Sequence, residues 1–508
     1  MKISIDLPES GRKSIAVFLT VLLFAAAAFN VFYALGSQRL RSWDESRHGV
    51  SACEMMTTGN YIVNTYDFKP DYWNVKPVFS FYCNIFGMKL FGRNIFGMRF
   101  ASALSFMIIA AVMFLMLRRE AGIAAALVGT AAFVVSPTNW VHGFRNGDPD
   151  AVFIMFCFAA FVLLWYSLKK EWLLPLSAFC FGMAFLTKSF HVGVPGLAAL
   201  LFVAVNWKRY SWRTLLSAAA AGMFPVLLWA FFRFRADGWL FFRSMVERDL
   251  LGRVAADGGC EHTASPWYDY LSTLNHYLIV IPLATAASSV VICLLNREKR
   301  CLFTPQGKLW AWATLNFMLP LLAFSSCAVK LPWYVFPCLV YLPVMLGISF
   351  YFALRWLRDA LGAKKNVFFV ILPALVILAE IVWIGIGEGK AIRVLVKRED
   401  QCDVLSVEQG GAPYRGATVY CVDAEGRPHL PHQKFMQMLR FLDCSVDLAG
   451  IDGFRRAPDD ALLVCSFEGL KEKAELRAAA ERTAEKLSLR LIRCADGHAL
   501  YRKARTAL

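Results

Sequence analysis

Long apolar runs recur along the first 389 residues of this 508-residue chain. A helix needs roughly 20 apolar residues, at about 1.5 Å of rise each, to cross the hydrocarbon core of a bilayer. We count about eleven such runs, centred near residues 25, 106, 129, 159, 180, 199, 223, 282, 317, 344 and 377. Because some runs are short or merge, the sequence predicts an α-helical polytopic membrane protein with about 11–13 transmembrane helices.

The composition agrees, since 57% of the residues are hydrophobic and only 18% are charged, which lies outside the balance of soluble proteins. The first run imitates a secretory signal peptide, with basic residues before it and "FAAAAF" within it. At about 21 residues it is long for the apolar core of a signal peptide. We therefore expect it to be retained as the first helix.

Lys and Arg mark alternate connections between the runs, and cytoplasmic loops of membrane proteins retain these residues. The basic connections lie near residues 12–13, 118–119, 169–170, 208–213, 297–300 and 355–365. The remaining connections are predicted to face outside, and they contain "SWDESRH", "FRNGDPD", "LTKSFH", residues 233–270 and "AVKLPWY". The net charge of +16 is in part this topology signal, so it does not call for a nucleic-acid partner.

Residues 390–508 differ from the preceding 1–389, because they are polar and charged with short apolar segments followed by "EGLKEKAELRAAAERTAEKL". This pattern predicts a small soluble α/β domain. Eleven spans after a cytoplasmic N-terminus would place the domain outside, whereas an even number would place it in the cytoplasm. Its five cysteines are odd in number and lack the CxxC spacing of a zinc site, so no disulfide framework is defined.

The stretch "SWDESRH" places charged residues directly after the first apolar run. Ser42 and Glu45 fit a capping box, which would give Glu45 a purely structural role. Asp44 would lie in the first helical turn, where the helix dipole keeps a carboxylate ionised, with Arg47 and His48 on the same face. These features suit a general base that acts on a lipid-borne substrate.

Further charged residues stand at the ends of apolar runs on the same predicted side. Asp148 and Asp150 enter a span, and carboxylates there usually have a function because burying them is costly. Lys76, Lys188 and Lys330 suit phosphate ligands, although lysines near a membrane also extend toward lipid headgroups. Tyr268 lies in a stretch that could form a lid, and this signal is weak by itself.

Seven motifs then appear in order between about residues 40 and 350. They are the end of a short first span, an outside loop with "WDESRHG…EMMTTGNYIV…KPVFSFY", and then "FGMRFASAL", "RNGDPDAVFIMF", "MAFLTKS", "SPWYDYL" and "KLPWYVFPCLVYLPVMLG". In this order the chain resembles the bacterial glycosyltransferases related to protein O-mannosyltransferases and to the aminoarabinose transferase of lipid A. The resemblance does not extend to the C-terminal domain.

The resemblance implies the GT-C fold, in which extracytoplasmic loops form a cavity where a polyprenyl-phosphate sugar donor meets its acceptor. The acidic pair of the family corresponds to Asp44 and Glu45, and its Lys-Pro to Lys76 and Pro77. Asp150 corresponds to the family's later Asp, with Asp148 as the shifted alternative. The chain departs from the family at His48, where Tyr is common, and at Val78, which replaces a second proline.

The implied reaction is sugar transfer in the bacterial inner membrane, with the active site on the outer, periplasmic side and with inversion at the anomeric carbon. Asp44 would be the base and Asp150 would support it or orient the acceptor. The phosphate or substrate would be bound by side chains from several loops: Arg47, His48, Lys76, Asp148, Lys188, Tyr268, Lys330 and Tyr334.

Three alternatives stay open at this level. The acceptor is a lipid such as lipid A, a glycan or a protein, and a ligase of surface polysaccharide would use the same donor class. A flippase for a lipid-linked sugar would need the same cationic cavity, although transporters often show repeated halves, which this sequence lacks. No cofactor is certain, and a divalent cation would have only Asp44, Glu45 and His48 as ligands in this stretch.

Overall fold

The structure is a computed structural model that describes residues 9–37, 40, 44–136, 143–252, 301–328, 330–361, 414–459, 461–467, 473–495 and 497–503. The chain divides into two compact units. The first comprises residues 1–35, 72–83 and 99–388, and the second comprises residues 36–71, 84–98 and 389–508. The predicted division of the chain into domains at residue 389 stays a prediction.

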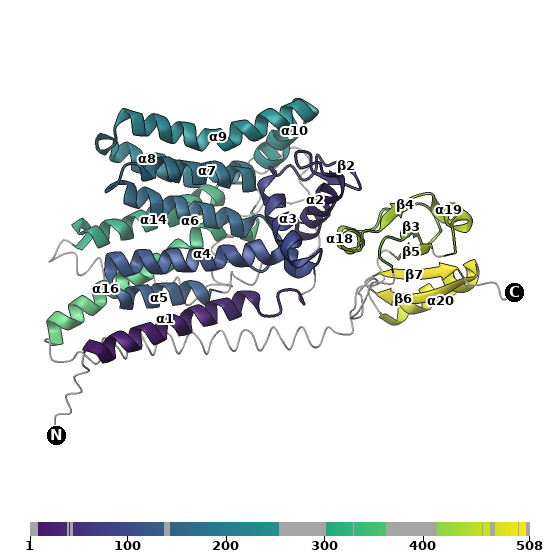
Figure 1. Ribbon diagram of the computed structural model, residues 1–508, viewed down its shortest axis with the longest axis horizontal. Helices are drawn as coiled ribbons and strands as arrows, with labels where there is room; N and C mark the ends of the chain where they lie inside the picture. The colour runs from purple at the N-terminus through teal and green to yellow at the C-terminus, as the bar shows by residue number, and fades with distance from the viewer. Residues whose placement is uncertain are drawn as a thin grey trace, which may run out of the picture. The chain divides into compact units, whose positions relative to one another are not determined.

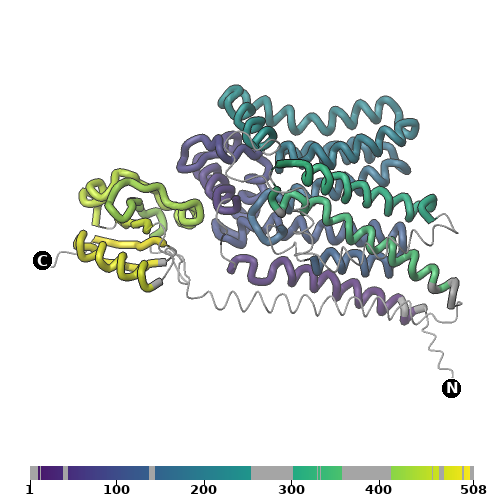
Figure 2. The backbone as a smooth tube through the Cα atoms, turned by 180° about the vertical axis from the view of Figure 1, so that it is seen from behind, coloured from purple at the N-terminus to yellow at the C-terminus, as the bar shows by residue number. Residues whose placement is uncertain are grey.

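The first unit is a bundle of apolar helices, seen from opposite sides in Figures 1 and 2. Its helices, with α4 reaching into the second unit, are α1 (Glu9–Phe32), α4 (Ile95–Ala121), α5 (Ile123–Val134), α6 (Asp150–Ser167), α7 (Leu173–Lys188), η2 (Ser189–Val192), α8 (Gly193–Val205), η3 (Trp207–Arg209), α9 (Trp212–Asp237), α10 (Leu240–Met245), η4 (Val246–Leu251), η5 (Cys301–Phe303), α14 (Pro305–Ser325), η6 (Pro332–Tyr334), α15 (Phe336–Leu339) and α16 (Tyr341–Leu361). Helix α7 packs against both α6 and α9, and α16 packs against α5 and α14.

Six helical segments in the described part of the chain are long and apolar enough to cross a membrane. They are Lys13–Phe32, Ile95–Ala121, Asp150–Ser167, Leu173–Val205, Trp212–Asp237 and Phe336–Trp356. Every predicted run falls on a described helix except those near residues 282 and 377, which lie outside the described residues. The runs near 180 and 199 are separated only by the short turn η2, and the run near 129 gives a helix of 12 residues.

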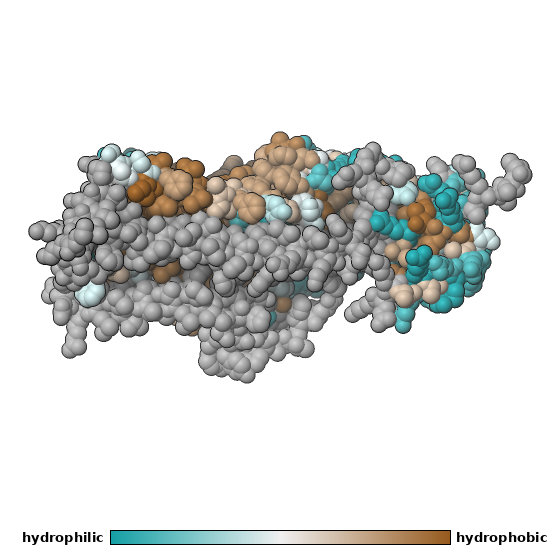
Figure 3. Space-filling view, turned by 90° about the horizontal axis from the view of Figure 1, so that it is seen from below, coloured by the Kyte–Doolittle hydropathy of each residue, from teal (hydrophilic) through white to brown (hydrophobic). Residues whose placement is uncertain are grey.

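Large apolar side chains remain exposed on this unit, as expected for a surface that lies against lipid rather than water. On α9, for example, Leu216, Phe224 and Phe231 are at least 60% exposed. In Figure 3 brown, apolar side chains gather over the helical unit, whereas teal, hydrophilic side chains are frequent on the C-terminal residues. The chain is therefore a multi-pass membrane protein with a small C-terminal α/β domain.

The second unit contains a five-stranded sheet with strand order β4-β3-β5-β7-β6. Its strands are β3 (Thr418–Asp423), β4 (Ser445–Asp447), β5 (Leu462–Ser466), β6 (Leu489–Ala495) and β7 (His498–Lys503). Strand β3 runs parallel to β4 and β5, whereas β7 runs antiparallel to β5 and β6. The helices that follow these strands are α18 (Gln433–Phe441), α19 (Gly450–Arg456) and α20 (Lys473–Leu487).

The sheet is buried on both faces, because alternate residues of β5 belong to separate apolar clusters. Leu462 and Val464 pack in one cluster with residues of α18, and Leu463 and Cys465 pack in the other with residues of α20. Helix α2 (Asp44–Thr58) contributes Val50 to the first cluster. The loop that follows the first apolar run thus shares its core with the C-terminal residues.

The remaining elements of the loops are a two-stranded hairpin and one helix. The hairpin pairs β1 (Thr65–Tyr66) with β2 (Lys69–Pro70), and helix α3 (Phe79–Phe91) follows it. The hairpin lies in the second unit, whereas α3 is shared between the two units.

Candidate active site

Helix α2 begins at Asp44, so Asp44 and Glu45 occupy its first turn as the sequence suggests. Ser42 lies outside the described residues, so the capping box is not tested. Glu45 is 1% exposed and His48 is 2% exposed, whereas Asp44 is half-buried. Among the described residues the Asp44 carboxylate has no hydrogen bond or ion pair.

Arg47 is held by a fork of two hydrogen bonds. Its Nε and Nη2 atoms each donate to Asp71, at 2.8 Å, and its guanidinium lies 4.4 Å from the centre of the Tyr66 ring. Burial raises the pKa of Tyr66 to about 12, so this ring stays uncharged. The Arg47 guanidinium is thus bound to the Asp71 carboxylate. The role of Arg47 as a phosphate ligand stays a prediction.

Lys76 belongs to the first unit, where it contacts a carboxylate that sequence reasoning missed. Its Nζ atom lies 2.5 Å from Oδ2 of Asp249, and the Ser189 hydroxyl donates to the same oxygen at 2.9 Å. Asp249 lies in the π-helical turn η4, a form that recurs at functional sites. Ser189 has a φ of 53°, which is strained for a residue with a side chain.

Lys188 precedes Ser189 and forms a second buried ion pair with Asp150. Asp150 opens α6 and Lys188 ends α7, so the pair ties the ends of two neighbouring helices together. The Lys188 ammonium also lies 5.7 Å from the centre of the Tyr334 ring. Because Lys188 and Ser189 are consecutive, the two ion pairs lie in one polar region of the first unit.

The remaining residues predicted from the sequence are Asp148, Lys330 and Tyr268. Asp148 is buried and accepts a hydrogen bond from Asn146 at 3.3 Å. Lys330 is buried and donates to the Cys327 carbonyl at 2.6 Å. Tyr268 lies outside the described residues. Within the described ranges no three His, Cys, Asp or Glu side chains come together as a metal site.

Two more charged residues were missed by sequence reasoning, Glu54 and Arg440, and both are almost fully buried. Glu54 stands in "SACEMMTT", where a single acidic residue among small and apolar residues is a signal for a buried partner. Arg440 and Asp249 have no comparable signal, because each lies in a segment with several other charged residues.

Comparison with known proteins shows which proteins this chain resembles. Residues 75–229 match the family described as dolichyl-phosphate-mannose-protein mannosyltransferase. An undecaprenyl phosphate-alpha-4-amino-4-deoxy-L-arabinose arabinosyl transferase of Pseudomonas fluorescens is 28% identical over 69% of this chain and 61% of its own length. A second such enzyme of that species is 30% identical over 66% of this chain and 60% of its own length. The chain thus spans about three-fifths of these curated relatives.

The fold is also that of solved structures. The crystal structure of ArnT from Cupriavidus metallidurans bound to undecaprenyl phosphate matches with a TM-score of 0.66 and 16% identity, over 96% of this chain and 98% of that one. The apo structure of the same protein matches with a TM-score of 0.63 and 17% identity, over the same shares of the two chains. This likeness confirms the expected GT-C type of fold.

Proposed function

Because residues 75–229 carry a domain of the dolichyl-phosphate-mannose-protein mannosyltransferase family, we propose that this chain is an integral membrane glycosyltransferase. It moves a sugar from a polyprenyl-phosphate donor to an extracytoplasmic acceptor, which is lipid A, a glycan or a protein. The names of the curated relatives support undecaprenyl phosphate as the lipid carrier and 4-amino-4-deoxy-L-arabinose as the first sugar to test.

The observation that carries the proposal is the buried polar region of the first unit. Lys76, which is partly buried, and Lys188, which is buried, are cations near the end of α7, and each is neutralised by a carboxylate. A phosphate that leaves a sugar needs cations of this kind, because negative charge develops on its oxygen as the bond breaks. Lys76 would contact the phosphate, and Lys188 would support the site together with Asp150 and Tyr334.

Asp44 supplies the complementary chemistry. An acceptor hydroxyl donates its proton to the Asp44 carboxylate while the acceptor oxygen forms a bond to the anomeric carbon. The bond from that carbon to the phosphate oxygen breaks, and the electron pair leaves with the lipid phosphate. Attack from the face opposite the phosphate inverts the anomeric carbon. The basic loops remain in the cytoplasm, so the reaction takes place on the periplasmic side of the inner membrane.

The test is transfer by the purified protein in lipid vesicles. Radiolabelled undecaprenyl-phosphate aminoarabinose is supplied with lipid A, surface glycan and envelope protein as separate acceptors. We expect label to appear in one acceptor and undecaprenyl phosphate to be released in equal amount. Movement of the intact donor across the vesicle, without transfer to any acceptor, would contradict the proposal and favour a flippase.

A further inference from the structure

Helix α18 approaches helix α2 closely within the second unit. A Cβ atom on Gly49 of α2 would lie 2.5 Å from Oε1 of Gln437 on α18, so a larger residue would not fit without movement. The Gln437 amide donates to Sγ of Cys53 at 3.5 Å. Val50 lies in one apolar cluster with several residues of α18, including Leu439. The two helices therefore form one packed layer.

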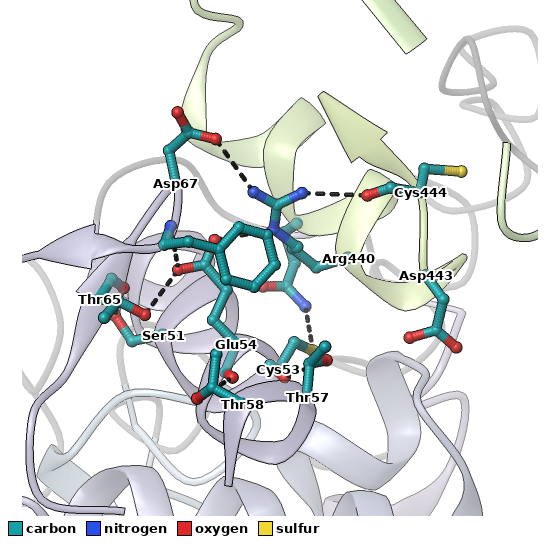
Figure 4. A network of polar contacts seen from close by, with 12 residues as sticks. Ser51, Cys53, Glu54, Thr57, Thr58, Thr65, Asp67, Arg440, Asp443 and Cys444 are labelled. Carbon is teal, nitrogen blue, oxygen red and sulfur yellow. Dashed lines mark hydrogen bonds and ion pairs between the residues drawn. The ribbon is translucent and has the colours of Figure 1, made fainter. Parts of the chain in front are cut away.

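An ion pair crosses this layer. Nε of Arg440 donates to Oε1 of Glu54 at 2.8 Å, and the two side chains are 3% and 0% exposed. The guanidinium also donates to the Cys444 carbonyl at 3.1 Å and to the Asp67 carboxylate at 3.2 Å (Figure 4). Arg440, from the C-terminal part of the chain, thus contacts both helix α2 and the β1-β2 hairpin.

The same pair fixes the β1-β2 hairpin. The second oxygen of Glu54 accepts from the Thr65 hydroxyl at 2.7 Å and from the Phe68 amide at 3.0 Å. Asp67 and Phe68 have φ angles of 55° and 57°, as in a type I′ turn, which is unfavourable for a bulky residue. The Arg440 guanidinium stacks 4.5 Å from the centre of the Phe68 ring. Arg440 and Glu54 together hold a strained turn in place.

The hairpin leads back to the start of α2. It is followed by Asp71, which forms the fork with Arg47, and Arg47 lies on the same face of α2 as Asp44. Glu54 sits further along the same helix. Arg440 is therefore connected to the first turn of α2 by two routes, through the helix itself and through the hairpin.

We propose that Arg440 is a positioning residue for sugar transfer, which fixes the helix that carries Asp44 to the C-terminal α/β domain. This inference rests on the proposed function. A buried charge that loses its partner is strongly unfavourable, whereas removal of both charges is tolerated much better. Arg440 thus acts through Glu54, and a small displacement of a catalytic group is enough to slow a reaction about 10²-fold.

The test compares Arg440→Met with Arg440→Lys, with the double variant Glu54→Gln/Arg440→Met, and with Arg455→Met as a matched control. Arg455 lies in the same domain, but its side chain is 63% exposed and pairs with an exposed Asp452. For each purified full-length protein, kcat, donor Kd and hydrogen exchange of the backbone amides are measured. Only monodisperse protein is compared, so loss of folded material does not enter the result.

We expect Arg440→Met to lower kcat about 10- to 100-fold and to change donor Kd less than about twofold. Amides of α2 and the hairpin should exchange about 10²-fold faster, while those of α6 and α7 are unchanged. The lysine variant should be intermediate, the double variant should recover most of the loss, and Arg455→Met should match wild type.

The outcomes separate the two proposals. Unchanged exchange in α2 and the hairpin of Arg440→Met would overturn the positioning role whatever the activity. Exchange that is faster while kcat stays at the wild-type value would overturn it as well. Absence of transfer by the wild type concerns the proposed function alone.

Discussion

Nζ of Lys76 lies 2.5 Å from Oδ2 of Asp249, and both side chains are largely buried. The lysine that we propose as a phosphate ligand is therefore already neutralised by a carboxylate. A lipid phosphate that binds Lys76 has to compete with Asp249, because two anions next to one ammonium repel each other.

Replacement of this carboxylate by an amide should strengthen donor binding. Asp249→Asn still accepts a hydrogen bond from Ser189 but leaves Lys76 without its anion, so the phosphate becomes the partner. We expect the donor Kd to fall about tenfold, which corresponds to about 1.4 kcal/mol. The measurement is calorimetric titration with undecaprenyl phosphate. Weaker binding by the variant would show that Asp249 orients Lys76 instead of competing with the phosphate.

Removal of the lysine should have the opposite effect. The change is best made as Lys76→Met in the Asp249→Asn background, because the single change would leave Asp249 as an uncompensated buried charge. A charge-assisted hydrogen bond contributes about 1.5–3 kcal/mol, so donor binding should weaken at least tenfold relative to Asp249→Asn alone. Equal affinity of the two proteins would reduce Lys76 to an interfacial anchor.

Asp44→Asn should abolish sugar transfer without abolishing donor binding. Asn keeps the size of Asp and still caps a helix, but it does not accept the proton of the acceptor hydroxyl. General bases contribute about 10²- to 10⁴-fold, and we expect kcat to fall in that range. Asp452→Asn, whose side chain is 78% exposed, is the matched control. Near-wild-type turnover would remove Asp44 from the role of base and make Asp150 the next candidate.

The pair of Lys188 and Asp150 should affect stability as well as activity. Lys188→Met leaves a buried carboxylate without its cation, which typically costs about 3–5 kcal/mol. Lys188→Met/Asp150→Asn removes both charges and should regain most of the stability. Thermal unfolding in detergent measures this, with Lys170→Met in an exposed loop as the control. Equal unfolding temperatures for the single and double variants would contradict a buried ion pair.

Thiol labelling tests which loops of the protein face the outside of the membrane. A cysteine at the exposed position Asn60 should react with an impermeant reagent added outside, and one at Lys170 should react only after the membrane is opened. Burial raises the pKa of Cys53 to about 11 and that of Cys421 to about 12, so these native thiols stay protonated and covered. The parent protein without the added cysteine supplies the background. Labelling of position 170 alone would reverse the predicted topology.

The apolar runs predicted the helices well because length and hydrophobicity alone decide whether a segment suits a bilayer. The capping-box pattern placed Asp44 in the first turn of α2, and the cost of charge inside a membrane placed Asp150 at the start of α6. Sequence reasoning could not foresee that Lys188 pairs with Asp150 or that Lys76 pairs with Asp249. These contacts join segments far apart in the chain, and a single sequence does not show which charges meet.

The sequence also did not predict two unusual backbone conformations. Nothing in "LTKSFH" indicates that Ser189 adopts a positive φ, because Gly is the residue that normally signals this conformation. The Asp67-Phe68 turn likewise lacks the Asn-Gly or Asp-Gly pattern of a type I′ hairpin. In both places tertiary contacts, with Asp249 and with Glu54, stabilise a backbone that the local sequence disfavours.

The shared core of α2 and α18 also has a consequence for biosynthesis. Roughly 390 residues separate Val50 from Leu439, and a ribosome that adds about 5–20 residues per second needs roughly 20 to 80 s to make them. During that time the residues of α2 that pack against α18 lack this partner, while most of the membrane helices are already emerging. We therefore expect the proposed sugar transfer to begin only after the residues of α18 have been made and have packed against α2.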